Sequence, residues 1–83
     1  MKLLYFAWLR TRIGVGEEEV TPPQEVATVG DLLKWLEGRG GGYTEALAQT
    51  DLVRVAVNQE FAGLDAPLAP GDEVALFPPV TGG

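Results

Sequence analysis

The pattern of apolar and polar residues at the start of the chain predicts two strands joined by a turn. Leu3 to Leu9 is apolar at odd and even positions alike, which is typical of a central strand covered on both faces. Gly14-Val15-Gly16 predicts a turn, and Glu17 to Thr21 a more polar strand that ends before two prolines. Neighbouring strand residues point to opposite faces, so we expect the three glutamates to form a solvated edge rather than a site.

The next segment has the periodicity of an amphipathic helix. Thr28 can cap its start, and Asp31 completes an approximate capping box. One apolar stripe follows at positions i, i+3, i+4 and i+7, formed by Val29, Leu32, Leu33 and Leu36. Glycines at 38 and 40–42 end the helix, whose stripe is free to cover one face of a sheet. Trp35 lies off this stripe, either at the border of the core or exposed for a partner.

The second half of the chain predicts short strands after a brief helical turn at 44–49. The valines at 53, 55 and 57 alternate with other residues up to a turn at Asn58-Gln59, and a strand fragment around Phe61 follows. Pro70-Gly71 suits the centre of a type II turn before a last strand at 73–77. Val74 and Leu76 share one face of that strand, so Phe77 falls on the opposite face.

This element order predicts an α+β fold with one main helix covering one face of a mixed sheet, the β-grasp arrangement of ubiquitin-like proteins. The first and last apolar strands are expected at its centre. Because Pro78 cannot donate a ladder hydrogen bond, we divide the chain into a β-grasp domain at 1–77 and an extended diglycine tail at 78–83.

Composition narrows the chemistry open to this domain. The 83 residues include neither cysteine nor histidine, which excludes Ser-His and Cys-His nucleophile pairs and ordinary zinc sites. We expect no metal, no bound cofactor and no complete active site on this chain alone. Twelve acidic against six basic residues give a formal charge of -6, so nucleic acid and anionic membranes are poor partners. A basic protein partner fits better, although acidity also serves solubility by itself.

Two other patterns are excluded by their context. The apolar start is followed by Arg10-Thr11-Arg12 where a secretory signal needs small residues, so we expect a cytoplasmic protein. No stretch approaches the ~20 apolar residues of a membrane span. The glycines at 38–42 follow a helix instead of preceding one, which argues against a phosphate-binding loop.

The end of the chain carries the candidate reactive group. Pro78 and Pro79 stiffen the arm, which limits the freedom lost when it enters a channel. Gly82 and Gly83 lack a Cβ and can pass through a slot too narrow for other residues. An α-carboxylate at Gly83 is ionised at neutral pH and needs activation. Adenylation by ATP, followed by displacement of AMP by sulfur, would convert it to a nucleophilic thiocarboxylate.

The segment Phe-Pro-Pro-Val-Thr-Gly-Gly at 77–83 resembles the terminus of the MoaD sulfur carriers, the small subunits of molybdopterin synthase. Further resemblance comes from the opening strand with Arg10, from Ala56-Val57-Asn58-Gln59, and from Pro67-Leu68 with Gly71-Asp72-Glu73-Val74. It covers essentially the whole chain. The terminal motif is specific, and the others are supportive.

The resemblance implies a two-stage cycle and two protein partners. An adenylyltransferase similar to the ubiquitin-activating enzyme (MoeB type) would use ATP on the Gly83 carboxylate, and a sulfur donor would form the thiocarboxylate. The tail would then enter the large synthase subunit (MoaE type), in a heterotetramer, and pass sulfur to cyclic pyranopterin monophosphate. The arm residues Pro78, Pro79, Val80 and Thr81 would bind the large subunit inside its channel.

For docking we single out three aromatic residues. Phe77 is the first expected anchor because the strand pattern turns it away from the core. Phe6 and Phe61 occupy positions that contribute to an apolar patch in relatives, although either could equally belong to the core. Three rival functions remain: a sulfur carrier for thiamin or tRNA thiolation, a ubiquitin-like protein modifier joined to lysines, and a binding domain with an inert tail.

Overall fold

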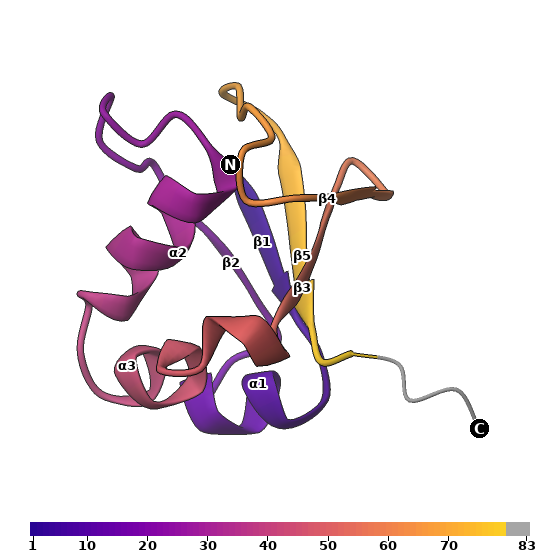
Figure 1. Ribbon diagram of the computed structural model, residues 1–83. Coiled ribbons are helices and arrows are strands. Elements are labelled where there is room, and N and C mark those ends of the chain that lie inside the picture. Colours follow the sequence, from indigo (N-terminus) through magenta and orange to yellow (C-terminus); the bar gives the residue numbers. More distant parts are fainter. Residues whose placement is uncertain (80–83) are drawn as a thin grey trace.

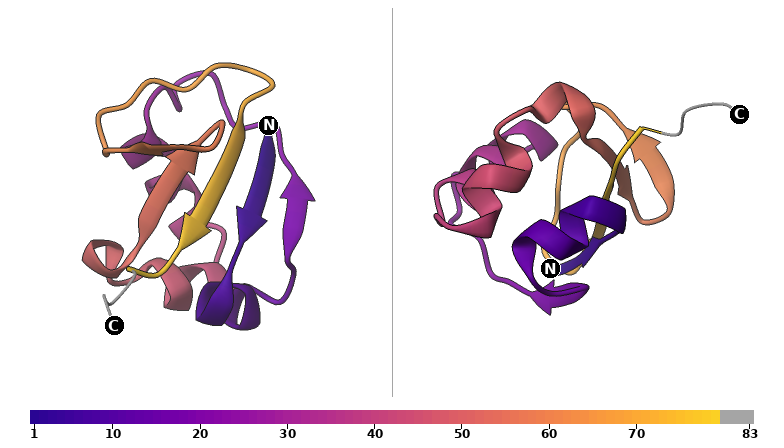
Figure 2. Two further views of the ribbon diagram at one scale, coloured as in Figure 1. Left: turned by 90° about the vertical axis from the view of Figure 1, so that its right-hand side faces the viewer. Right: turned by 90° about the horizontal axis from the view of Figure 1, so that it is seen from below.

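The sheet of this protein has five strands in the order β2-β1-β5-β3-β4 (Figures 1 and 2). The computed structural model describes residues 1–79. Its strands are β1 (Lys2–Tyr5), β2 (Glu17–Glu19), β3 (Arg54–Val57), β4 (Glu60–Ala62) and β5 (Glu73–Phe77). The strand β5 runs parallel to β1 and antiparallel to β3, so the sheet is mixed. The predicted α+β class and the central place of the first and last strands are confirmed.

The helices lie on one side of the sheet and at one of its ends. They are α1 (Ala7–Ile13), α2 (Val29–Glu37), α3 (Gly42–Leu47) and the 3-10 turn η1 (Thr50–Leu52). Figure 1 shows α2 beside one face of the sheet, with α1 and α3 below it at the end where β5 finishes. The other face of the sheet is not covered by any element of the described chain.

The helix α2 forms as its sequence predicts. The hydroxyl of Thr28 accepts a hydrogen bond from the Asp31 N–H at 3.2 Å, and the Asp31 carboxylate accepts one from the Thr28 N–H at 3.2 Å. This reciprocal pair satisfies two donors that helix geometry leaves free. The four stripe residues are all buried in the core. Trp35 is half-buried and packs at the border of that core, which settles the two options left by the sequence.

The predicted strand over Leu3 to Leu9 is wrong beyond Tyr5. Phe6 is extended and caps a helix that begins at Ala7, where φ is +56°. Leu9 is buried and Ile13, one turn later, packs against the core. A short run apolar at every position is compatible with either element, because burial of a helix turn needs the same residue types. The first two strands are therefore joined through α1 and not by a tight hairpin.

The predicted turns are confirmed by their backbone angles. Asn58 and Gln59 both have positive φ, 51° and 70°, as a two-residue hairpin turn between β3 and β4 requires. Gly71 has φ of 89°, and the Asp72 N–H donates to the Ala69 carbonyl at 3.1 Å, which closes a turn of the expected type. These local choices fix the register in which β3, β4 and β5 pair.

The strand β5 ends at Phe77, the last residue of the predicted β-grasp domain, and the division of the chain into domain and tail stays a prediction. Of the predicted tail at 78–83, the first two residues are described, and 80–83 lie outside the described residues. Within the described chain, no helix has the length and apolar character needed to cross a membrane.

Candidate functional site

The chain leaves the sheet at the edge of an uncovered face. The last paired residue of β5 is Phe77, which lies opposite Arg54 of β3. Pro78 has no N–H to continue the ladder, so the arm separates from the sheet there. Pro78 and Pro79 are both half-buried, which keeps the root of the arm against the body. The predicted roles of Val80, Thr81, Gly82 and Gly83 fall on residues outside those described and stay predictions.

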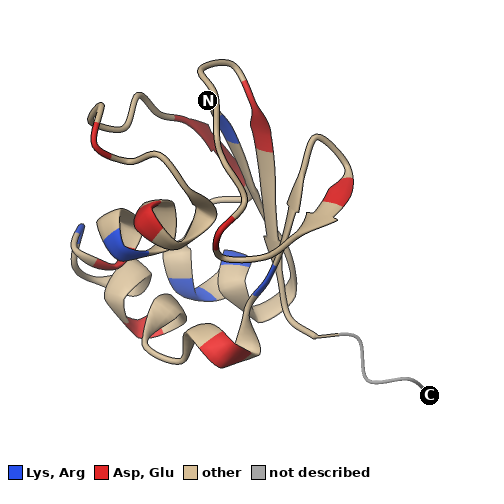
Figure 3. Cartoon of the chain, turned by 45° about the horizontal axis from the view of Figure 1, so that its top comes forward, with Lys and Arg blue, Asp and Glu red and all other residues tan. Residues whose placement is uncertain are grey.

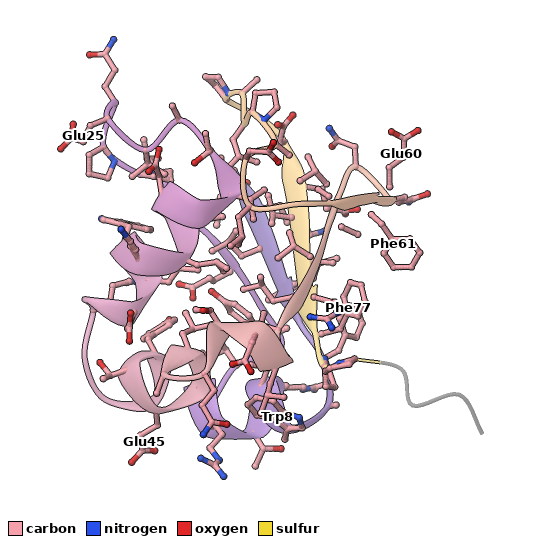
Figure 4. All side chains as sticks on the ribbon, in the orientation of Figure 1. Trp8, Glu25, Glu45, Glu60, Phe61 and Phe77 are labelled. Carbon is pink, nitrogen blue, oxygen red and sulfur yellow. The ribbon has the colours of Figure 1, made fainter. Side chains whose placement is uncertain are left out.

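Phe77 projects from the sheet on the side away from α2, as its strand position predicts. Its neighbours Val74 and Leu76 are fully buried on the other side. The ring of Phe77 lies 5.9 Å from the ring of Phe61, centroid to centroid, at an angle of 55° (Figure 4). Such tilted pairs are a favoured aromatic geometry. The two side chains therefore form one aromatic surface where the arm begins.

Phe61 and Phe6 are surface residues, so the alternative that they belong to the core is wrong. Phe61 is 85% exposed and Phe6 is 48% exposed. The Phe6 N–H donates to the Leu76 carbonyl at 3.1 Å, which continues β1 by one residue alongside β5. Phe6 thus lies on the same side of the sheet as Phe77. Exposed phenylalanines so close together are unusual unless a partner covers them, and their binding role stays a prediction.

Small residues fill the middle of this uncovered surface. Ala75 of β5 is paired with Leu4 on one side and Ala56 on the other, and Ala56 is paired in turn with Phe61. The row places apolar side chains across four adjacent strands. We refer to the surface as the docking face; its members are Leu4, Phe6, Ala56, Phe61, Ala75 and Phe77.

The sequence did not predict a polar cluster that lies on the other side of the sheet. Glu18 of the predicted solvated edge turns inward, and its carboxylate accepts hydrogen bonds from the hydroxyls of Tyr5 and Tyr43 and from Arg39. The Arg39 guanidinium also stacks on the rings of Trp35 and Tyr43, 5.3 and 4.6 Å from their centroids. Only the flanking glutamates, 17 and 19, are exposed as predicted. This cluster fastens β2 to the ends of α2 and α3.

The cluster also changes the acidity of its members. Burial by itself opposes ionisation of Glu18, but the hydrogen bonds from Tyr43, Tyr5 and Arg39 outweigh it and lower the pKa of that carboxyl. Burial, followed by the bond to Glu18, raises the pKa of the Tyr5 hydroxyl, and the same two causes raise that of Tyr43. The glutamate is therefore held ionised and the tyrosines neutral, which suits a structural role.

The chain matches one protein family along almost its full length. The model of the ThiS family matches residues 3–83. A relative from Escherichia coli (strain K12), named molybdopterin synthase sulfur carrier subunit, is 40% identical over 83 residues, which are 100% of this chain and 99% of that protein.

Solved structures agree with this relationship. A Pyrococcus furiosus protein described as a candidate subunit 1 of molybdopterin converting factor has a TM-score of 0.77 and 35% identity, covering 95% of each chain. Small archaeal modifier protein 1 of Haloferax volcanii has a TM-score of 0.75 and 36% identity, covering 96% of this chain and 97% of its own. The ubiquitin-like β-grasp prediction and the resemblance to the MoaD carriers are confirmed, and this chain belongs to the ThiS/MoaD family.

Proposed function

We propose that this chain is the sulfur carrier subunit of a molybdopterin synthase. The observation that carries the proposal is structural: the last strand passes directly from an exposed aromatic face into the arm that precedes the diglycine. The full-length relative from Escherichia coli bears that name, and its match extends over the tail. The aromatic surface that would bind a partner and the reactive chain end therefore belong to one continuous segment, which starts at β5.

In the first stage the Gly83 carboxylate attacks the α-phosphorus of ATP and releases pyrophosphate, with an adenylyltransferase as the first partner. Sulfur from a donor then displaces AMP from the mixed anhydride and leaves a thiocarboxylate. Glycine at the attacked position removes steric bulk around the carbonyl carbon. Because ATP is the activating substrate, we infer that this stage takes place in the cytoplasm.

In the second stage the loaded tail enters the large synthase subunit. The docking face covers the opening while the arm places the Gly83 sulfur beside cyclic pyranopterin monophosphate. The described part of this chain supplies no histidine or cysteine, so the acid and base groups for sulfur transfer come from the large subunit. Two carrier turnovers supply the two sulfurs of the dithiolene.

The proposal is tested by altering only the chain end. Removal of Gly83, or addition of one lysine after it, should abolish molybdopterin formation in a reconstituted system. Neither change touches a residue of the described fold, so the melting temperature should stay the same. Carboxypeptidase B provides the matched control, because removal of the added lysine restores the native end and should restore activity. Full activity of either altered protein would contradict the proposal.

A second function has one observation in its favour. The Haloferax volcanii protein of similar fold is called a modifier. For this chain, such a role would use the same activated diglycine, with a lysine amine of another protein as the acceptor. Mass spectrometry of cell digests separates the two functions. The digest needs a protease that cuts after threonine, because the last basic residue of the chain is Arg54 and trypsin would leave residues 55–83 on the target lysine. With such a protease, Gly-Gly remnants on lysines of other proteins that vanish when this chain is deleted would favour the modifier, and their absence favours sulfur transfer alone.

A further inference from the structure

Three arginines near the base of the arm make no ion pair with any residue among 1–79. They are Arg10 and Arg12 of α1 and Arg54 of β3. Lys2 and Arg39, in contrast, each bind a glutamate of β2. Figure 3 shows basic positions on α1 and at the start of β3, at the end of the molecule where the described chain finishes. Three of the six lysines and arginines therefore lie at this end of the molecule and form no ion pair within residues 1–79.

Arg54 lies next to the docking face and projects on the same side of the sheet. It is paired across the sheet with Phe77 and is exposed. The two residues line one surface hollow of about 630 Å³ together with Phe61. Within residues 1–79 the guanidinium donates one hydrogen bond, to the backbone carbonyl of Asp51 at 3.0 Å, which holds the side chain in place and leaves other donors available to a partner.

The two arginines of α1 line two further surface hollows. Arg10 lines a hollow of about 380 Å³ with Phe6. Arg12 lines another of about 670 Å³ with Pro78 and Pro79. Each of the three hollows thus combines one arginine with at least one residue that the sequence predicts to bind a partner.

Charge is distributed unevenly over the molecule as a result. The same three hollows hold one acidic residue each, which are Glu17, Asp51 and Glu45. The remaining nine acidic residues and three cations lie elsewhere in the chain and carry its whole formal excess of -6. The surface around the arm is balanced, and Glu17 there is already bound by Lys2. An acidic partner would be repelled by the body of the carrier but not by its tail end.

We propose that Arg10, Arg12 and Arg54 bind carboxylates around the opening through which the activating enzyme admits the tail. The inference rests on the proposed function and specifies the chemistry of its first partner. Guanidinium groups bind carboxylates through two parallel hydrogen bonds, and charges at the rim of an interface mainly govern the encounter rate and the orientation. An acidic activating enzyme would repel the acidic body of the carrier and attract these arginines. Together the two effects favour an approach in which the tail reaches the enzyme first.

Charge reversal tests this inference. Arg54→Glu and Arg12→Glu are compared with Lys34→Glu, which changes the charge equally at an exposed residue of α2 that also forms no ion pair among residues 1–79. Arg10 is set aside because its side chain lies against Gly16 and its replacement could disturb the fold. The measurement is carrier-dependent ATP–pyrophosphate exchange with purified activating enzyme, at low salt and at high salt.

Each reversal near the arm should raise the KM for carrier about 3- to 10-fold at low salt, with kcat unchanged. The difference should shrink at high salt because exposed charges are screened. Lys34→Glu should stay close to the unaltered protein. Equal KM values for all three variants, or a loss that salt does not reduce, would overturn the inference. If the unaltered carrier supports no exchange and never gains sulfur, the proposed function fails instead.

Discussion

The two faces of the sheet use the same strands for opposite purposes. On the face toward α2, Leu3, Tyr5, Val55, Val74 and Leu76 are buried and form the core with the helix stripe. The docking face holds Leu4, two alanines and three phenylalanines, each of which is exposed or half-buried. Since strand residues alternate between faces, the residues that determine stability alternate along each strand with those that would bind a partner.

The two faces also differ in how strongly packing constrains their residues. The apolar side chains of the helix-covered face pack in or against the core, so they are constrained by packing density. The docking face leaves apolar area in water that folding does not remove, and that area becomes useful only when a partner covers it. Substitutions on the two faces should therefore affect different measurements.

The largest effect on stability should come from Leu76→Ala. Leu76 is fully buried between Tyr5 and Val55 of the flanking strands. Its truncation leaves a cavity and should lower the free energy of unfolding by about 2–5 kcal/mol. Phe77→Ala, one residue further on, is the matched control and should cost only about 1 kcal/mol through the lost contact with Phe61. Urea denaturation measures both, and equal losses would break the distinction between the faces.

Binding should show the reverse order. Phe77→Ala should weaken affinity for the large subunit by about 2 kcal/mol or more, since aromatic anchors at interface centres carry much of the binding energy. Glu60→Ala, an exposed neighbour of Phe61 on β4, is the control and should have little effect. Isothermal titration calorimetry gives both values. Unchanged affinity for the phenylalanine variant would remove Phe77 from the interface.

On the helix side, the Glu18 cluster should contribute a smaller but distinct share of stability. Glu18→Ala leaves the Tyr5 hydroxyl without its acceptor and should cost about 1–3 kcal/mol. Glu19→Ala is the control, because that side chain is 75% exposed and its one ion pair within residues 1–79 is with the N-terminal ammonium group at 3.7 Å. Thermal melting at neutral pH distinguishes them.

The same cluster predicts how stability depends on pH. The pKa of Glu18 is lower in the folded chain than in the unfolded chain. In the unfolded chain a glutamate has a pKa of about 4.3. Its contribution is therefore complete above that value and is lost as pH falls through the folded pKa. Glu18→Gln should flatten this acid limb of the stability curve. An acid limb that is identical in the variant would show that other carboxyls cause it.

The smallest effect should come from the cap of α2. Thr28→Ala removes the acceptor of the Asp31 N–H and should cost about 1 kcal/mol. Thr21→Ala, at an exposed loop position, should be nearly neutral. Neither change should alter partner affinity, because neither residue belongs to the docking face. An affinity change for Thr28→Ala would link the two faces.

Local signals account for what the sequence predicts well. The α2 stripe, its capping box and the turns at 58–59 and 70–71 each depend on residues within one or two turns of chain. The orientation of Phe77 follows from alternation inside a single strand. These features needed no knowledge of distant contacts, and the structure confirms each of them.

The features that the sequence did not predict depend on distant partners. The helix α1 is distinguished from a continued strand only by where Leu9 and Ile13 find their neighbours. Glu18 is held by residues 13, 21 and 25 positions away, so no local pattern marks it as different from the glutamates beside it. The exposure of Phe61 and Phe6 required the pairing of four strands.

One measurement decides whether this protein carries sulfur on its terminus. The purified chain is incubated with its activating enzyme, ATP and a sulfur donor, and the intact mass is recorded with and without ATP. Exchange of one oxygen for sulfur at Gly83 should add about 16 Da, confined to the C-terminal peptide and dependent on ATP. An unchanged mass, under conditions in which the enzyme loads a known carrier, would contradict the proposed role.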